Sequence, residues 1–143
     1  MILAWVALLG LSGVTNSQDA GAKKRFASVK VFVDSGEREL AAYQFELKVV
    51  RGSAKIVGVE GGEHAAYKEA PYYDTAAMAK DRIIIGAFNT AMELPKGRTR
   101  VSTVHMMIEG DAEPRYEVTL MTAGDGGGNE IAATVVLEKG EQR

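Results

Sequence analysis

Apolar and polar residues alternate along much of the chain, which is the pattern of a β-strand that buries one face. The clearest run starts at Tyr43, where Tyr43, Phe45, Leu47 and Val49 alternate with Gln44, Glu46 and Lys48. Further strands are predicted at residues 28–33, 54–60, 82–88, 99–108, 115–122 and 131–138. Short strands separated by turns at this spacing predict an all-β fold, an antiparallel β-sandwich.

Three segments add detail to this prediction. Residues 82–88, RIIIGAF, are apolar on both faces and predict a central strand. Residues 124–129 are rich in glycine and predict a flexible hairpin connection between the last two strands. One short helix of about two turns is expected at residues 74–80, in the long loop, because Asp74 is a suitable N-cap.

The N-terminus differs from the rest, because residues 2–11 are almost uniformly apolar. A helix needs about 20 such residues to cross a bilayer, so the run is instead typical of a secretory signal peptide. The small residues of Ala20-Gly21-Ala22 suit signal peptidase, and residues 15–17 offer a second cleavage site. We therefore predict an exported protein, secreted or held in the cell envelope, cleaved after Ala22. The alternative is that residues 2–11 form a buried first strand.

These boundaries divide the chain into a signal peptide at 1–22, a linker at 23–27, the sandwich domain at 28–138 and a tail at 139–143. No transmembrane anchor is expected after cleavage. The formal net charge is −2, and the one tight basic run, Lys23-Lys24-Arg25, is interpreted as a solvated leader. Nucleic-acid binding is therefore not expected. The absence of cysteine excludes disulfides and a thiol nucleophile.

Residues suited to catalysis or metal binding are scarce. The chain has two histidines, of which His105 falls inside a predicted strand and His64 in a loop. His64 could share a metal with Glu60 and Glu63, but a zinc site needs three or four ligands in fixed geometry. No nucleophile elbow, phosphate loop or paired-carboxylate pattern is present. We predict a protein that is not an enzyme and that has no metal or cofactor.

The candidate ligand-binding residues are aromatic. The long segment 61–81 holds Tyr67, Tyr72 and Tyr73 around Pro71. Exposed tyrosines can stack on sugar rings or anchor a protein partner, because they offer a large contact area at low entropic cost. The alternative is that these three tyrosines close the open end of the sandwich and belong to its core.

The chain resembles the cohesin family in four stretches: LAAYQFELKVV at 40–50, KIVGVEGG at 55–62, DRIIIGAFN at 81–89 and PKGRTRVSTVHMMIEGD at 95–111. The resemblance covers residues 29–137, although Val50-Arg51-Gly52 stands where the family has Tyr-Asp-Pro. It implies a jelly-roll sandwich, related to some carbohydrate-binding modules. It also implies a protein partner, since cohesins bind dockerins, which are small calcium-loaded helical modules.

Two functions follow as hypotheses. The first is an exported, non-catalytic protein-interaction module of cohesin-like type, whose partner is a dockerin-like or other exported protein. The alternative is a carbohydrate-binding module that holds a polysaccharide with its loop aromatics on the same fold.

Overall fold

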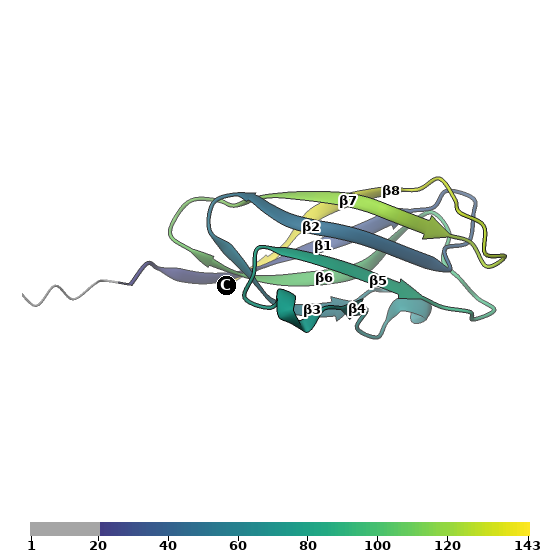
Figure 1. Cartoon of the computed structure of the whole chain (residues 1–143), viewed down its shortest axis with the longest axis horizontal. Helices are drawn as coiled ribbons and strands as arrows, with labels where there is room; N and C mark the ends of the chain where they lie inside the picture. Colours follow the sequence, from purple (N-terminus) through teal and green to yellow (C-terminus); the bar gives the residue numbers. More distant parts are fainter. Residues whose placement is uncertain (1–20) are drawn as a thin grey trace, which may run out of the picture.

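The computed structural model describes residues 21–143, which form two antiparallel sheets packed face to face (Figure 1). The predicted signal peptide lies almost wholly outside the described residues. The strands are β1 (Lys24–Asp34), β2 (Ala42–Arg51), β3 (Ala54–Gly61), β4 (Tyr72–Tyr73), β5 (Arg82–Phe88), β6 (Arg98–Glu109), β7 (Arg115–Gly124) and β8 (Thr134–Gln142). One sheet has the order β3-β6-β1-β8 and the other β4-β5-β2-β7. The predicted β-sandwich is confirmed.

The alternating pattern places one face of each strand in the core. Tyr43, Phe45 and Leu47 of β2 point inward and are at most 2% exposed. The remaining fully buried side chains come from both sheets and include Val31, Val33, Ile56, Ile83, Ile85, Val101, Val104, Met106 and Ile108. Burial of these apolar side chains is the main favourable term in folding.

Most connections cross from one sheet to the other, as expected for a jelly-roll type of sandwich. β7 pairs with β2, whereas β8 pairs with β1, so the two strands lie in different sheets. The loop at residues 124–129 does reverse the chain, with an antiparallel bridge between Gly124 and Glu130 and a hydrogen bond of 2.9 Å from Ile131 N to Ala123 O, but the two strands that it joins do not pair with each other as predicted. Adjacent strands with matching alternation can join across a sandwich as well as within a sheet, and local sequence does not distinguish the two.

The strands extend beyond the predicted domain boundaries. β1 begins at Lys24, inside the predicted linker, and β8 continues to Gln142, inside the predicted tail. Phe26 and Arg143 exchange backbone hydrogen bonds of 2.8 and 2.7 Å, so the two ends of the domain meet at one end of the sandwich (Figure 1). Both segments are polar, and their pairing with neighbouring strands rather than their own hydropathy keeps them extended.

The segment between β3 and β5 holds less helix than predicted. Residues 74–80 form one 3-10 turn, Thr75–Ala77, instead of two helical turns. Asp74 does cap it, because its carboxylate accepts a hydrogen bond from Ala76 N at 2.9 Å. The chain then pairs with β3, where Ala79 N donates to Ile56 O at 2.8 Å. These tertiary hydrogen bonds compete with further helix formation.

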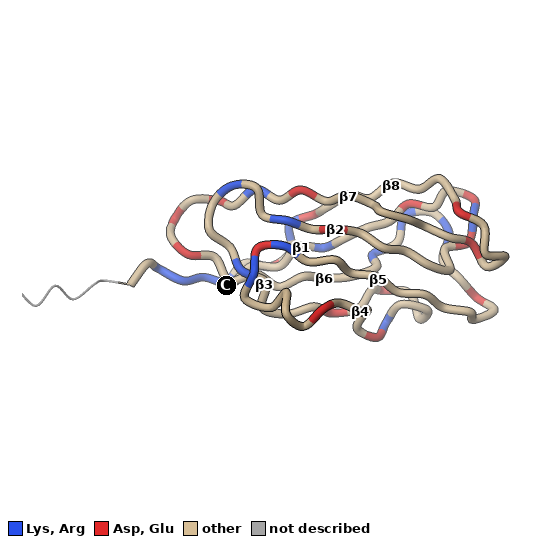
Figure 2. Tube along the Cα trace, viewed as in Figure 1, with Lys and Arg blue, Asp and Glu red and all other residues tan. Residues whose placement is uncertain are grey.

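β5 has a full neighbour on one side only. It pairs along its length with β2, but its other neighbour is the two-residue strand β4, which sequence analysis did not predict. Figure 2 shows that basic and acidic residues are interspersed over the sandwich, with the run Lys23–Arg25 at the start of β1. Within residues 21–143 the structure contains no helix of the length and hydropathy needed to cross a membrane.

Candidate functional site

Tyr67, one of the three candidate ligand residues, belongs to the core. Its ring is 3% exposed and packs edge-on against Tyr43, with ring centroids 5.2 Å apart. Its hydroxyl donates a hydrogen bond of 2.7 Å to Leu40 O. Burial raises the pKa of Tyr67 well above its ordinary value, so the hydroxyl stays protonated. Tyr67 therefore closes the sandwich, which was the alternative interpretation, and is not available to a ligand.

We expect Tyr67→Phe to lower the free energy of unfolding by about 1–2 kcal/mol, because Leu40 O would lose its buried donor while the ring would stay in place. Chemical denaturation with urea measures this change. Tyr72→Phe is the matched control, since the Tyr72 side chain lies on the surface, and it should leave the midpoint unchanged. Equal midpoints for Tyr67→Phe and the wild type would contradict the structural role of the hydroxyl.

Tyr72 and Tyr73, the other two candidates, point to opposite faces of the sheet. In β4 Tyr73 pairs with Ile85 and packs against the core, whereas Tyr72 pairs with Gly86 and is 71% exposed. Neighbouring residues of a strand alternate between its two faces. The three tyrosines therefore do not form a shared surface, and Tyr72 is the one that a ligand can reach fully.

A residue that sequence analysis missed completes the exposed surface. Phe88, at the end of β5, is 68% exposed and lies beside Tyr72, with ring centroids 6.1 Å apart and planes inclined by 15°. The register explains this contact, because Tyr72 is opposite Gly86 and Phe88 is two residues further along the same face. Alternation from the buried Ile83 and Ile85 could have placed Phe88 on the outer face. We name Tyr72 and Phe88 the aromatic pair.

The aromatic pair borders a flat, shallow surface on the outer face of the β4-β5-β2-β7 sheet. Gly86 and Gln44 are opposite one another, and Thr122 is opposite Gln44 on the next strand. A Cβ at position 86 would come within 3.1 Å of Tyr43 O, so the close approach of β2 favours glycine there. Without a side chain at Gly86, the side of Tyr72 that faces Gln44 stays open.

The other end of this face carries charges. The Arg82 Nε donates to Glu46 Oε2 at 2.7 Å, and Lys48 Nζ lies 3.6 Å from Glu46 and 3.8 Å from Glu117. The hydrogen bonds from Arg82, together with the positive charges of Arg82 and Lys48, hold the pKa of Glu46 below its ordinary value. The face therefore changes from aromatic to ion-paired along the strands.

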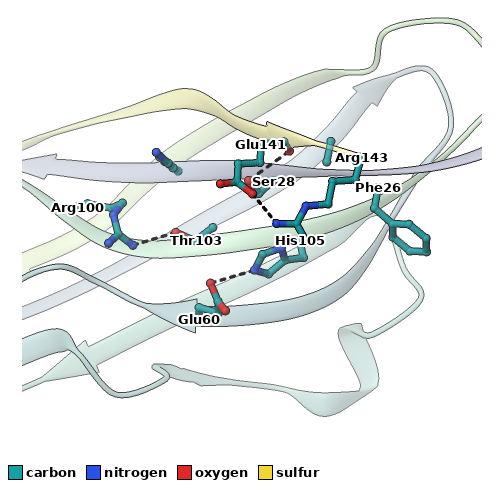
Figure 3. A pocket seen from close by; sticks show the side chains of 10 residues that line it. Phe26, Ser28, Glu60, Arg100, Thr103, His105, Glu141 and Arg143 are labelled. Atoms are coloured by element: carbon teal, nitrogen blue, oxygen red, sulfur yellow. Dashed lines mark hydrogen bonds and ion pairs between the residues drawn. The ribbon is translucent and has the colours of Figure 1, made fainter.

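The candidate metal residues do not converge. Glu60 of β3 lies 3.0 Å from His105 of the neighbouring strand β6 (Figure 3). Glu63 Oε1 accepts from Arg100 N, and His64 Nδ1 accepts from Ala66 N. Within residues 21–143 no group of three or more His, Asp or Glu side chains is placed to hold a metal ion. His105 does lie in a strand, with its side chain 40% exposed.

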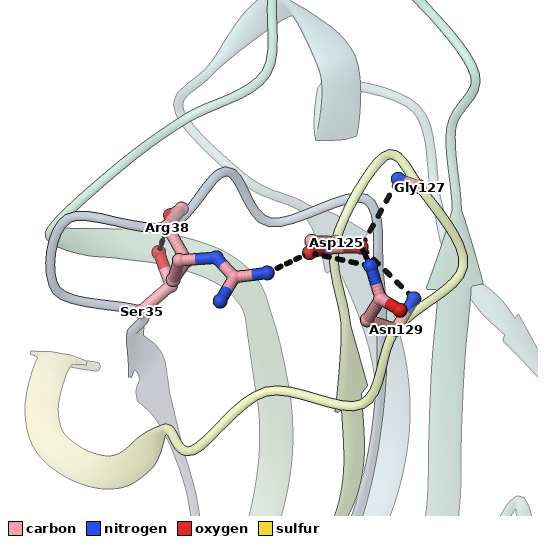
Figure 4. A network of polar contacts seen from close by, with 5 residues as sticks. All are labelled: Ser35, Arg38, Asp125, Gly127 and Asn129. Carbon is pink, nitrogen blue, oxygen red and sulfur yellow. Dashed lines mark hydrogen bonds and ion pairs between the residues drawn. The ribbon is translucent and has the colours of Figure 1, made fainter.

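The glycine-rich loop after β7 is held in place by Asp125. Its carboxylate accepts from the backbone N–H groups of Gly127 and Asn129, at 3.0 and 2.9 Å, and from the guanidinium of Arg38 (Figure 4). The backbone hydrogen bond from Asn129 is the largest cause that lowers the pKa of Asp125 to about 2. The loop is therefore a structured connection rather than a flexible one.

We expect Asp125→Asn to lower the Tm at pH 7, because an amide keeps one acceptor oxygen but loses the charge. The pKa of Asp125 is lower in the folded state than its ordinary 3.8, so ionisation stabilises the fold above that value. This contribution is lost as the pH falls from 3.8 towards 2. Thermal melts of both proteins across this range should therefore converge at low pH. A difference in Tm that stays constant down to pH 2 would contradict this explanation.

The surface bordered by the aromatic pair combines several kinds of side chain. It offers two exposed rings, amide and hydroxyl groups and a charged end, without a histidine or a paired nucleophile among its residues. Comparison of this chain with protein-family models, with curated proteins and with solved structures finds no match.

Proposed function

We propose that the domain is an exported, non-catalytic protein-interaction module. Its binding surface is the outer face of the β4-β5-β2-β7 sheet, which we name the aromatic face after the aromatic pair at one end. Its partner is a small exported protein that places an apolar side chain against Tyr72 and Phe88 and charged groups beside the ion-paired end.

The aromatic pair carries this proposal. Large apolar side chains that stay about 70% exposed and adjacent add nothing to the core, and such patches on soluble proteins mark interaction sites. Aromatic residues are enriched at the centres of protein interfaces, where a few of them supply most of the binding energy. Both rings lie on strands rather than on a loose loop, so little conformational entropy is lost when a partner binds.

The charged end of the face supports a protein partner. Arg82, Glu46, Lys48 and Glu117 form a continuous row of ion pairs across three strands. Surface ion pairs contribute little to stability, but they steer association and reject partners of the wrong charge pattern. An extended face with one apolar end and one end of mixed charge is suited to binding the surface of another folded protein.

The resemblance to cohesins supports the same proposal. In that family one face of a sandwich binds a small calcium-loaded helical module, so a dockerin-like partner is the first to test. Export fits this role, because the partner would be met outside the cytoplasm. Cleavage after Ala22 would leave β1, which begins at Lys24, intact.

A carbohydrate ligand is the second candidate, and the near-parallel rings favour it. The two rings are stacked with planes inclined by 15°, and the exposed ring surface that remains could stack on a sugar ring. A protein partner is preferred because the residues beside the rings form an open, shallow surface rather than a cleft that surrounds a sugar with polar groups.

The experiment is affinity capture with residues 23–143 immobilised and offered the organism's envelope and secreted extracts, with and without a calcium chelator. Two double variants are compared with the wild type. Tyr72→Ala/Phe88→Ala removes the aromatic pair. Val57→Ala/Val136→Ala removes two exposed apolar side chains, 43% and 44% exposed, from the opposite sheet and is the matched control.

The proposal predicts a protein that the wild type and the control retain and that the aromatic-pair variant loses. Calcium dependence of this capture would identify the partner as dockerin-like. Capture of the same proteins by all three forms would show that the aromatic face is not the binding surface. Retention of polysaccharide instead of protein, lost in the aromatic-pair variant, would replace the proposal with the carbohydrate-binding function.

A further inference from the structure

A second hollow lies on the outer face of the β3-β6-β1-β8 sheet, on the side of the sandwich opposite the aromatic face. It has a volume of about 670 Å³ and runs across the strands. Across this hollow, Gly58 of β3 is opposite His105 of β6, and His105 is opposite Ser28 of β1. Gly140 follows beside Ser28 on β8. Small residues on three of the four strands thus leave a trough, which we name the polar trough.

The floor of the polar trough is fixed by close packing. A Cβ at position 140 would lie 2.0 Å from Ser28 Oγ and 3.1 Å from both Ser28 Cβ and Ser28 O, so the close approach of β8 to β1 favours glycine here. Ser28 Oγ also donates a hydrogen bond of 3.5 Å to Glu141 O. Ser28 therefore lies between β1 and β8 at the floor, and longer side chains such as Arg100, His105 and Arg143 surround it (Figure 3).

The walls of the trough carry two cations that no carboxylate neutralises. His105 pairs with Glu60 at 3.0 Å, and Arg143 with Glu141 at 3.0 Å. Within residues 21–143 the ammonium of Lys30 and the guanidinium of Arg100 form no ion pair.

Two further carboxylates lie near these cations, but each has another partner. Glu138 is opposite Lys30 in the register and is bound by Arg98, and Glu63 accepts from the backbone N–H of Arg100 rather than from its guanidinium. The Arg100 guanidinium is positioned by hydrogen bonds to Gly61 O at 3.2 Å and Thr103 Oγ1 at 3.0 Å. A cation held in place in this way needs little ordering when an anion binds.

We propose that the polar trough binds an acidic polysaccharide, with Lys30 and Arg100 contacting its carboxylate or sulfate groups. The trough offers both donors and acceptors, including the hydroxyl of Ser28 and the carboxylates of Glu60 and Glu141, and this mixture suits the hydroxyl groups of a sugar. The ring of Phe26, 53% exposed at one end, offers an apolar surface for a sugar ring. Inorganic phosphate is a poorer fit, because it lacks the many hydroxyl groups with which a sugar could donate hydrogen bonds to these carboxylates.

This site is independent of the proposed protein partner, because its residues lie on the other sheet. With both sites occupied, the domain would join an exported protein to an anionic polysaccharide, one on each face of the sandwich.

The test is affinity electrophoresis of residues 23–143 through gels containing polygalacturonate, dextran sulfate or neutral dextran. Lys30→Met/Arg100→Met removes the two unneutralised cations. Arg38→Met/Lys55→Met removes one arginine and one lysine that are already ion-paired, with Asp125 and Glu109, and it is the matched control for net charge. Circular dichroism checks folding, and Lys30→Glu with Lys55→Glu as its control replaces the first pair if Arg100→Met unfolds.

We expect retardation by polygalacturonate or dextran sulfate but not by neutral dextran. The comparison between the two acidic gels distinguishes a carboxylate from a sulfate ligand. The apparent Kd should rise about tenfold or more in Lys30→Met/Arg100→Met, because hydrogen bonds to charged groups are among the stronger ones. The control should stay within about twofold of the wild type. No retardation in any acidic gel, equal loss in both double variants, or equal retardation by polyglutamate would overturn the proposal.

Discussion

Gly62→Ala should lower the free energy of unfolding by about 3 kcal/mol, because the added methyl group would overlap the backbone of a neighbouring strand. A Cβ at position 62 would lie 2.2 Å from Arg100 O and 2.9 Å from Val101 Cα, both backbone atoms of β6. Because neither atom can rotate away, β6 or the loop would have to shift. The shift would strain the hydrogen bonds from Gly62 N to Tyr67 O, 2.6 Å, and from Glu63 N to Arg100 O, 3.0 Å.

Chemical denaturation of Gly62→Ala and Gly58→Ala provides the comparison. A Cβ at position 58 would meet the His105 side chain at 3.6 Å, an ordinary contact, so Gly58→Ala should be neutral or slightly stabilising. A free energy of unfolding for Gly62→Ala close to that of Gly58→Ala would show that the loop does not lie against β6 as described. The segment that starts at Gly62 carries β4, so its packing also positions Tyr72.

Tyr72→Ala/Phe88→Ala should weaken binding of the captured partner by about 30-fold or more while leaving the fold intact. Residues at the centre of an interface commonly contribute about 2 kcal/mol or more each on truncation. In the free domain the two rings are 71% and 68% exposed, so their removal should change the free energy of unfolding by only about 0.5 kcal/mol. Isothermal titration calorimetry and urea denaturation measure the two quantities separately.

The control for this prediction is Val57→Ala/Val136→Ala, which should bind the partner as the wild type does. A large loss of stability in Tyr72→Ala/Phe88→Ala would mean that the aromatic pair is structural, and the loss of binding would then carry no weight. Unchanged affinity in a folded aromatic-pair variant would contradict the proposed function directly.

Most strands could be predicted from the sequence because their alternation is local. Tyr43, Phe45 and Leu47 bury one side of β2 whatever its neighbours are, so the pattern alone identifies the strand. Its partners could not be identified in this way. β7 and β8 have similar alternation, and their assignment to different sheets depends on pairing with β2 and β1, strands far away in the sequence.

The candidate site was harder to predict, because exposure depends on the tertiary fold. Tyr67 and Tyr72 are five residues apart in one polar segment, yet one closes the core and the other lies on the surface. The sequence contains no signal that separates them, since the Leu40 carbonyl that binds Tyr67 lies 27 residues away. Phe88 could have been placed on the outer face by alternation, but its contact with Tyr72 depends on β4, a strand of two residues.

The most direct test of the aromatic face as a protein-binding surface is site-specific photocrosslinking in the organism's envelope extract. A photoreactive phenylalanine analogue replaces Thr122, on the aromatic face, or Val136, on the opposite sheet. We predict one defined protein adduct from position 122, lost on Tyr72→Ala/Phe88→Ala, and none from position 136. Adducts from position 136 alone, or none from either position, would contradict the proposed function.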